Sequence, residues 1–323
     1  MNSGELNLKR VYEVQGRITQ LGYDKTSTKI IPPHSVLIGL AGQGKTRGTA
    51  AMNYVELCTN QSIASILPSD SFYSEFLYQN VESRYKELRD ISSGDGGRGG
   101  LNLQMIYNLY IPHCSMQEQK KIGDFLYLLD QRIAIQNKVI EKYESLIKAL
   151  AHEIIGKNAP NTMLSECVCC TSSTLKESDL SDAGAVPAYG AAGISGFTDN
   201  ALSAGDSLLI TKDGSGVGSL RYVSGPHSFV GTMNSMTPRD GFYLPYIYYA
   251  LHNVSFETYR TGQAIPHIYF RDYGKERIFC PGYLDQKRIA IGLERIESKM
   301  LIERYFKEHL LSVKAYLLNA LFI

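Results

Sequence analysis

The fold is decided by a short segment that occurs twice, first as EQKKI at residues 118–122 and again as DQKRI at residues 285–289. Each copy comes shortly after a proline, Pro112 or Pro281, and each opens a long run without further proline. Because proline breaks a helix interior, such runs are compatible with long uninterrupted helices. The duplicated segment therefore marks two equivalent helix starts in one chain.

Other segments repeat in the same order and at a nearly constant offset, which chance does not produce. The period is far longer than the roughly 20–50 residues of a solenoid repeat, so the chain contains two domain-sized units. The alternative is an old duplication without functional asymmetry. The further matches are SVL at 35–37 with SLL at 207–209, GQG at 42–44 with GSG at 214–216, and FYSEFLY at 72–78 with FYLPYIY at 242–248.

Apolar residues recur at alternating spacings of three and four from Glu118 to about Ile155, which is typical of a coiled coil. Ser115 lies three residues before Glu118, at capping-box spacing, and Gly156 ends the pattern. Tyr143 and Ile154 are expected on the same stripe. The predicted seam consists of Ile122, Leu126, Leu129, Ile133, Gln136, Ile140, Ile147 and Leu150.

A similar but less regular stripe runs from Asp285 to the end of the chain, with Glu303 in the place of Gln136 and with Lys307 and Lys314 on or near the seam. Neither stripe can be buried by its own helix, so we expect the two helices to pair as an antiparallel coiled coil. The alternatives are packing on the globular domains or dimerisation of the chain. The second seam consists of Ile289, Leu293, Ile296, Met300, Leu310 and Leu317.

These patterns predict an α+β fold of two tandem mixed α/β domains, each followed by a long helix, with a pseudo-two-fold internal repeat. The expected bounds are 1–115 and 157–284 for the domains, and 116–156 and 285–323 for the helices. Within the domains we expect strands at 35–39 and 206–211, short helices at 72–78 and 242–251, and equivalent loops at 92–100 and 261–267.

Composition excludes several classes of function. The formal net charge is +1, so attraction to DNA would have to come from local groups of basic residues, and an anionic membrane is not an expected partner. The six cysteines include the run CVCC at 167–170, which does not have zinc-ligand spacing, so no metal site is expected. Neither a secretory leader nor an apolar run of about 20 residues is apparent. We expect a reducing cytoplasm as the compartment.

One motif points to a different function. The segment Gly39–Thr46 fits the P-loop pattern GxxxxGK[ST], in which Lys45 would contact nucleotide phosphates and Thr46 a magnesium ion. The equivalent turn at 213–218 lacks the Lys-Ser/Thr pair. We therefore favour a glycine-rich turn that presents Lys45 and Arg47 to a DNA backbone. A P-loop-type nucleotide-binding enzyme and a coiled-coil interaction protein remain the alternatives.

The repeat and the long helices carry a family resemblance, through residues 110–150 and 280–317 and through residues 189–198 and 209–216. In these segments the chain resembles the specificity (S) subunits of type I restriction-modification systems. The first domain is shorter than the second and lacks the front segment that residues 162–196 supply.

The resemblance implies a non-catalytic subunit whose two target-recognition domains each read half of a bipartite site on double-stranded DNA. It implies helices that act as a spacer and dock two methyltransferase subunits, with restriction subunits as possible further partners. S-adenosylmethionine and ATP would be held by those partners, and this chain would hold no cofactor.

Candidate DNA-binding residues are cations and hydrogen-bonding side chains near the predicted turns. Phosphate contacts need positive charge, and base edges need donors and acceptors in a groove. No catalytic residue is expected. The phosphate candidates are Lys45, Arg47, Arg98, Lys212 and Arg221, and the base-edge candidates are Asn60, Gln61, Ser215, Asn234, Gln263 and His267.

Overall fold

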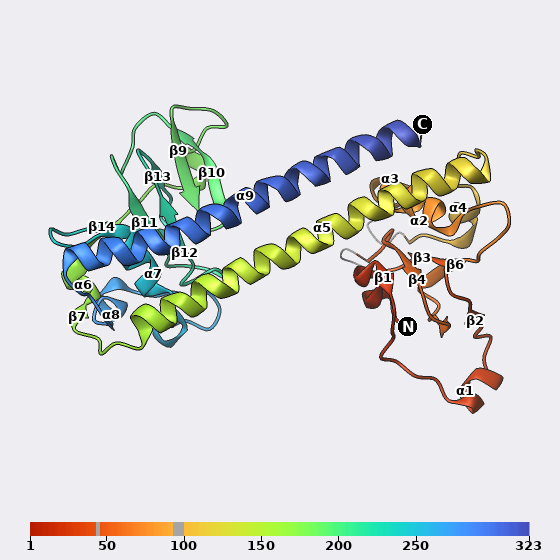
Figure 1. Cartoon of the computed structure of the whole chain (residues 1–323), viewed down its shortest axis with the longest axis horizontal. Helices are drawn as coiled ribbons and strands as arrows, with labels where there is room; N and C mark the ends of the chain where they lie inside the picture. Colours follow the sequence, from red (N-terminus) through yellow and green to blue (C-terminus); the bar gives the residue numbers. More distant parts are fainter. Residues whose placement is uncertain (43–45, 93–99, 323) are drawn as a thin grey trace. The chain divides into compact units, whose positions relative to one another are not determined.

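The chain is seen in a computed structural model that describes residues 1–42, 46–92 and 100–322, and it divides into two compact units (Figure 1). Unit 1 comprises Met1–Asn137 and Arg304–Ile323, and unit 2 comprises Lys138–Glu303. Two long helices, α5 (Met116–Ala151) and α9 (Tyr283–Leu321), contribute to both units. The predicted long helices are thus confirmed, each beginning two residues before the expected repeat segment.

The two long helices pair in antiparallel orientation. Within unit 1, Asp130 of α5 forms an ion pair with Lys314 of α9 at 2.5 Å, and Arg132 lies over the ring of Phe306. Rising residue numbers on α5 therefore meet falling numbers on α9. Every predicted seam residue is buried or half-buried, including Gln136 at 2% exposure. Glu118 N donates to Ser115 Oγ at 3.2 Å, which forms the predicted N-cap.

The end of the first helix departs from the predicted pattern. A π-helical turn at His152–Gly156 includes a hydrogen bond from Lys157 N to His152 O at 3.0 Å, one residue wider than an α-helical bond. The extra residue advances the helix face by one position. Ile155 is consequently buried, whereas Ile154 is 39% exposed. The expectation that Ile154 continues the stripe was wrong for this reason.

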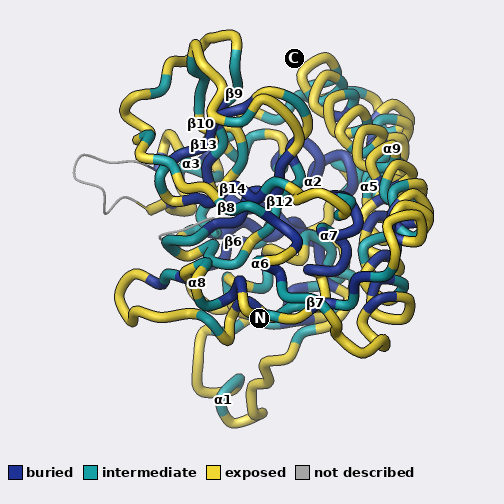
Figure 2. Tube along the Cα trace, turned by 90° about the vertical axis from the view of Figure 1, so that its left-hand side faces the viewer, coloured by how far each residue is buried: buried dark blue, intermediate teal, exposed yellow. Residues whose placement is uncertain are grey.

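Unit 1 is built on a four-stranded sheet in the order β1-β4-β3-β6. β3 is antiparallel to both β4 and β6, and β1 runs parallel to β4. The segment around α1 (Gln20–Asp24) is largely exposed (Figure 2). The remaining elements of unit 1 are a 3-10 helix (Ser3–Leu8), β1 (Arg10–Val11), β2 (Ile30–Ile31), β3 (Val36–Gly39), β4 (Ala50–Asn53), β5 (Leu57–Cys58), β6 (Ile63–Ile66), α2 (Ser74–Ser83), α3 (Tyr85–Ile91) and α4 (Leu103–Tyr107).

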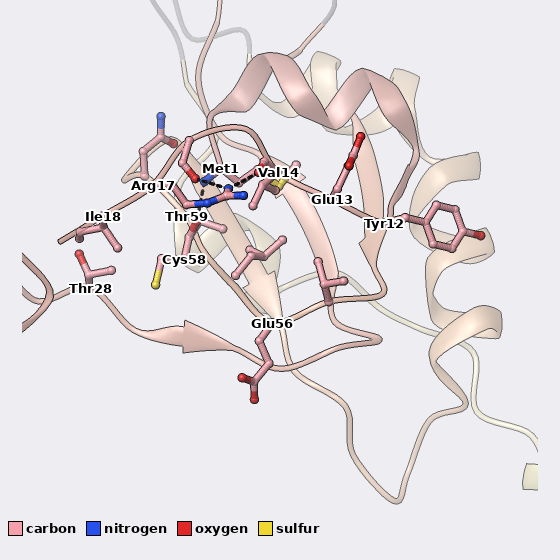
Figure 3. A pocket seen from close by; sticks show the side chains of 14 residues that line it. Met1, Tyr12, Glu13, Val14, Arg17, Ile18, Thr28, Glu56, Cys58 and Thr59 are labelled. Carbon is pink, nitrogen blue, oxygen red and sulfur yellow. Dashed lines mark hydrogen bonds between the residues drawn. The ribbon is translucent and has the colours of Figure 1, made fainter. Parts of the chain in front are cut away.

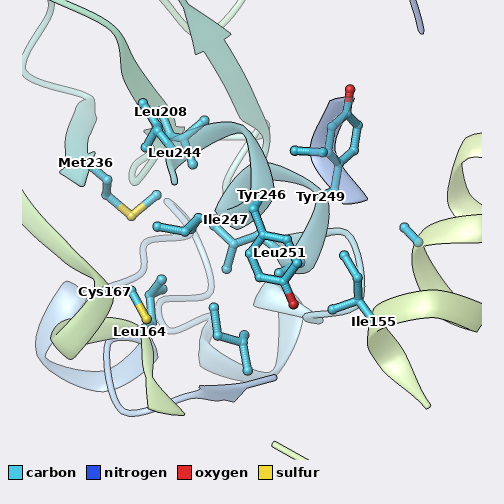
Figure 4. Close-up of a cluster of buried hydrophobic side chains, with 14 of the residues drawn as sticks. Ile155, Leu164, Cys167, Leu208, Met236, Leu244, Tyr246, Ile247, Tyr249 and Leu251 are labelled. Carbon is cyan, nitrogen blue, oxygen red and sulfur yellow. The ribbon is translucent and has the colours of Figure 1, made fainter. Parts of the chain in front are cut away.

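Unit 2 contains a four-stranded sheet in the order β12-β11-β14-β8 and a three-stranded sheet in the order β10-β9-β13. Its main apolar cluster surrounds α7 and takes in residues of both long helices (Figure 4). The elements are β7 (Thr162–Met163), α6 (Leu164–Cys167), β8 (Val168–Ser172), β9 (Val186–Gly190), β10 (Gly193–Thr198), β11 (Ser207–Thr211), β12 (Leu220–Val223), β13 (Ser228–Phe229), β14 (Met233–Pro238), α7 (Leu244–Leu251), α8 (Phe270–Tyr273), β15 (Arg277–Ile278) and 3-10 helices at Glu177–Asp179 and Phe256–Tyr259.

The internal repeat is visible in the sheets. Strands β4-β3-β6 of unit 1 correspond to β12-β11-β14 of unit 2, with the same order and the same antiparallel pairings. The predicted strands at 35–39 and 206–211 are confirmed as β3 and β11. The predicted short helices are confirmed as α2 and α7, each beginning two residues later than expected. The units differ at their edges, because β8 extends the sheet beside β14 whereas β1 extends it beside β4.

Two features are absent from the described residues. No helix among them combines the length and the apolarity that crossing a membrane requires. Within residues 1–42, 46–92 and 100–322, no group of three or more histidine, cysteine or acidic side chains is placed to hold a metal ion.

Candidate nucleic-acid interface

The first part of the candidate interface in unit 2 is the turn between β11 and β12. Thr211 N donates to Ser219 O at 3.0 Å and Gly218 N donates to Thr211 O at 2.9 Å, which closes the hairpin. Gly218 has φ of 85°, and a Cβ atom there would lie 2.8 Å from Cβ of Phe256. Glycine is therefore required by both conformation and space. The turn places Ser215 on the surface.

The second part is the loop at 261–267, which is closed by its own pair of backbone hydrogen bonds. Thr261 N donates to His267 O and His267 N donates to Thr261 O, both at 2.9 Å. Gly262 has φ of 84°. Gln263 lies on the exposed stretch of this loop, and His267 is half-buried at its base.

Backbone hydrogen bonds hold the two loops together. Ile268 N donates to Lys212 O at 2.9 Å, and Gly214 N donates to Pro266 O at 2.9 Å. Lys212 N in turn donates to Thr232 O at 2.9 Å, which anchors the pair to the start of β14. We call this arrangement the loop platform. It brings together four predicted contact residues from distant parts of the sequence, namely Lys212, Ser215, Gln263 and His267.

Two other predicted residues of unit 2 lie elsewhere. Arg221 is on β12, and its Nη2 atom lies 3.8 Å from the position a Cβ atom would take at Gly193 of β10. Asn234 is only 4% exposed, because it accepts a hydrogen bond from Ser172 Oγ at 2.8 Å and donates to Tyr273 Oη at 3.2 Å. An amide committed to the interior is out of reach of a base edge. We therefore correct the prediction by removing Asn234 from the contact set.

Unit 1 repeats two of the three backbone hydrogen bonds of this platform. Leu40 N donates to Ser62 O at 2.8 Å, as Lys212 N donates to Thr232 O. Leu101 N donates to Leu40 O at 3.0 Å, as Ile268 N donates to Lys212 O. Leu101, which follows the loop at 92–100, is therefore joined to Leu40, which follows β3, in the same way as Ile268 is joined to Lys212 in unit 2.

Of the predicted contact residues of unit 1, the structure describes Arg47, Asn60 and Gln61. Lys45 and Arg98 lie outside the described residues, and Arg47 is half-buried in the turn before β4. Asn60 and Gln61 are exposed in the turn between β5 and β6, next to the Ser62 carbonyl that accepts from Leu40.

Next to the Asn60 turn, an open pocket of about 660 Å³ is lined by residues from the N-terminus, the segment after β1 and the end of β5 (Figure 3). Met1 closes one side, and its terminal amine donates to Cys58 O at 2.7 Å.

The P-loop alternative is contradicted by the element that comes after the motif. A P-loop joins a strand to a helix, whose N-terminus attracts phosphate. Here the segment Gly39–Thr46 lies between β3 and β4, two antiparallel neighbours in one sheet, and Gly48 N donates back to Gly39 O at 2.8 Å. The motif therefore belongs to a hairpin turn that leads into a strand, whereas nucleotide binding by a P-loop requires a helix terminus.

Sequence reasoning missed a cation beside the platform of unit 2. The Arg271 guanidinium lies 4.7 Å from the ring centre of Tyr269, and the Tyr269 ring contacts that of His267 at 5.2 Å. The Arg271 side chain is 78% exposed. The sequence signal was the triplet Tyr269-Phe270-Arg271, shortly after the loop. It indicates a contact residue only once the loop is known to be hydrogen-bonded to the turn.

Comparison with known proteins gives a consistent result. Residues 2–145 match the model of the type I restriction modification DNA specificity domain. The specificity subunit of the type I restriction enzyme MjaIX from Methanocaldococcus jannaschii is 29% identical over 143 residues, which are 42% of this chain and 32% of that relative. The match therefore spans about a third of the relative's length.

Solved structures share the fold. The S subunit of a type I restriction-modification system from M. genitalium matches with a TM-score of 0.63 and 18% identity, over 91% of this chain and 84% of its own. A chain from a type I R-M system, solved in a study of complex assembly and conformational transition, matches with a TM-score of 0.57 and 16% identity. The match covers 99% of this chain and 90% of the other.

The fold and the doubled platform define a protein of two tandem sheet-and-helix units that share a pair of antiparallel helices. Residues 2–145 match the model of the type I restriction modification DNA specificity domain, which confirms the predicted resemblance to type I specificity subunits, and the solved S subunit shares the fold.

Proposed function

We propose that the chain is the specificity subunit of a type I restriction-modification complex and that each loop platform contacts one half of a bipartite DNA target. The observation that carries this proposal is the duplicated joint at the base of the loop platform. One chain builds the same joint between a glycine-rich turn and a second loop twice, on sheets of the same topology. Two similar surfaces with different exposed residues suit the reading of two different half-sites.

The exposed chemistry of the platform supports DNA as the ligand. In unit 2, Lys212 and Arg271 offer positive charge for phosphate oxygens, whereas Ser215, Gln263 and His267 offer donors and acceptors for base edges. In unit 1, Arg47 offers the charge and the exposed amides of Asn60 and Gln61 offer the hydrogen bonds. Lys45, Arg98 and Arg221 stay in the proposed set of phosphate contacts.

By the same proposal, catalysis belongs to partners. The chain would dock two methyltransferase subunits through its long helices, with restriction subunits as further members, and the helices would serve as the spacer between half-sites. S-adenosylmethionine and ATP would be bound by those partners in the cytoplasm, and this chain alone would bind neither. Its contribution is then the choice of sequence, not a chemical step.

The test is methylome sequencing of cells that express the chain together with its methyltransferase. The expected result is one split adenine-methylated motif, and the absence of any motif would contradict the proposal. DNA binding by the assembled complex then tests the platform. Lys212→Glu should weaken binding to all sequences without changing the motif. The slope of log Kd against log salt concentration should fall by about one, the value for one lost phosphate contact.

The matched control is Lys157→Glu, which reverses an exposed cation between α5 and β7 and should leave the salt dependence unchanged. An altered motif in Lys212→Glu would reassign Lys212 to base reading, and unchanged binding would remove the turn from the interface.

A further inference from the structure

Unit 2 contains two thiols in direct contact that the proposed function does not use. Cys167 is the last residue of α6, and Cys280 lies two residues beyond β15 and just before α9. Their Sγ atoms are 3.7 Å apart, although 113 positions separate them in the sequence. Cys167 sits within the apolar cluster around α7 (Figure 4).

The backbone around both thiols is fixed, so the contact is built into the fold. β7 pairs with β15, with Met163 opposite Arg277. Asn161 clamps the second segment, because Cys280 N donates to Asn161 Oδ1 at 2.7 Å and Asn161 Nδ2 donates to Cys280 O at 3.0 Å. Cys280 cannot move away without breaking these bonds, and Cys167 is held separately, because its carbonyl accepts from Arg239 N at 2.9 Å.

The two thiols differ in accessibility and acidity. Cys167 is fully buried, whereas Cys280 retains 9% exposure. A hydrogen bond from Cys167 lowers the pKa of the Cys280 thiol, and the same contact, together with burial, raises the pKa of Cys167. Because the thiolate is the reactive form, Cys280 is the thiol that an oxidant meets first.

We propose that Cys167 and Cys280 form an oxidisable dithiol, a modification site for a small peroxide that converts the pair into a disulfide. The access is narrow, which favours hydrogen peroxide over a bulky disulfide reagent.

In the first step the Cys280 thiolate attacks one peroxide oxygen and breaks the O–O bond, giving a sulfenic acid and hydroxide. In the second step the Cys167 sulfur displaces hydroxide from that sulfenic acid, and the S–S bond forms. Two thiols and one peroxide thus give one disulfide and two waters. The two electrons that the sulfurs lose reduce the peroxide.

The disulfide would tie the start of β8 to the residues that lead into α9. It would close a loop of more than a hundred residues, and long loops restrict the unfolded chain most. The reduced and oxidised forms should therefore differ in resistance to unfolding in unit 2, with little change in the folded structure.

The experiment uses the purified full chain, reduced, freed of reductant and treated with hydrogen peroxide. After alkylation and non-reducing trypsin digestion, we expect a linked pair of peptides, residues 158–176 with residues 278–287, that dithiothreitol separates. After oxidation, two of the six thiols should no longer react with the alkylating reagent. Formation of the disulfide should raise the unfolding temperature, and reduction by dithiothreitol should reverse that rise.

Three variants assign the partner, since residues 158–176 contain Cys167, Cys169 and Cys170. Cys167→Ser should abolish the link and leave Cys280 as a sulfenic acid that dimedone traps. Cys169→Ser and Cys170→Ser are the matched controls and should retain the link. The proposal is overturned if wild-type protein loses Cys58, Cys114 or Cys169 to peroxide while Cys167 and Cys280 remain alkylatable, or if Cys280 is over-oxidised without a link. Because that result is read from wild-type protein, it does not depend on how well any variant folds.

Discussion

Units 1 and 2 pack the same pair of helices against corresponding elements, but unit 1 does so with charges. Arg10 forms a two-pronged ion pair with Glu75 of α2, and its guanidinium also lies 3.3 Å from Asp130 of α5. Lys314 of α9 reaches both Asp130, at 2.5 Å, and Glu82, at 3.1 Å. Burial alone would lower the pKa of Lys314, but the two carboxylates raise it overall.

Unit 2 has apolar residues at two of the equivalent positions. With Gln119 aligned to Gln286, the counterpart of Lys314 is Ile147, which is 4% exposed. The counterpart of Glu75 is Pro245, and that of Asp130 is Glu297, which accepts a hydrogen bond from the buried Tyr249 hydroxyl at 2.5 Å. One acid is retained, but the cations that surround it in unit 1 are not.

Both units must pack the long helices against their other elements, but they use different interactions to do so. A buried ion network loses solvation on folding and is often no more stabilising than a well-packed apolar cluster. It does, however, penalise any shift of α9 along α5, because a displaced Lys314 would lose both carboxylates, Asp130 and Glu82, that compensate its burial. We infer that the network sets the register of the helices in unit 1, whereas unit 2 relies on shape.

The largest expected effect comes from removing the centre of the network. Arg10→Ala leaves the Glu75 carboxylate, whose side chain is 7% exposed, without its cation. Breaking one partner of a buried ion pair costs about 3–5 kcal/mol of unfolding free energy. Urea unfolding measures the cost, and hydrogen exchange should place the lost protection in α2 and the last part of α9.

Arg288→Ala is the control for this prediction, since its ion pair with Asp285 is exposed and contributes about 0–1 kcal/mol. Equal losses in the two variants would mean that the network is no stronger than a surface pair, and the contrast between the units would disappear.

An intermediate effect should be shared by both units. Gln119 accepts from Tyr73 N at 2.8 Å and donates to Cys114 O at 3.0 Å. Gln286 does the same with Tyr243 N at 2.9 Å and Pro281 O at 2.9 Å. Each glutamine is at most 2% exposed. Replacement by alanine strands buried backbone groups, so each variant should lose about 1–3 kcal/mol in urea unfolding.

The exposed neighbour supplies the control, because Gln117→Ala should change stability little. Comparable losses in Gln119→Ala and Gln286→Ala would show that this joint is a common requirement. A loss in only one of them would make the joint another point of difference between the units.

This shared joint also shows why so much of the fold could be predicted. EQKKI and DQKRI are recognisable because both glutamines make the same pair of hydrogen bonds to equivalent backbone groups, and the seam follows from periodicity alone. Strands β3 and β11 were bounded by turn residues. Local patterns of this kind survive duplication, so comparing the two halves of the chain was as informative as comparing two relatives.

The network and the platform joint could not be predicted, for a physical reason. Arg10, Glu75 and Lys314 are distant in sequence, and no periodicity relates one to another. The joint of Ile268 with Lys212 uses backbone groups, which any residue supplies. Asn234 failed as a candidate because its burial depends on Ser172 and Tyr273, which are strand and helix neighbours only in the fold.

The smallest expected effect tests the charge of Glu297, the acid of unit 2 that corresponds to Asp130, through its neighbour Glu294. Glu294 lies one helical turn before Glu297, and burial together with the Glu297 charge raises the pKa of Glu294. The folded state therefore holds this proton to a higher pH than the unfolded chain does. Stability must then fall as pH rises from the unfolded pKa, about 4.3, through the raised folded value. In unit 1 the position equivalent to Glu294 is Tyr127, which carries no such charge.

Glu294→Gln removes the repulsion, so it should stabilise the protein by about 0.2–0.5 kcal/mol at neutral pH and by nothing below about pH 3.5. Urea unfolding at the two pH values measures the difference, with Glu308→Gln on the exposed end of α9 as the control. A gain that persists at the lower pH would come from helix propensity or packing instead of charge. In that case Glu297 would be no more than a hydrogen-bond acceptor for Tyr249, and the contrast with the cation-rich network of unit 1 would rest on Ile147 and Pro245.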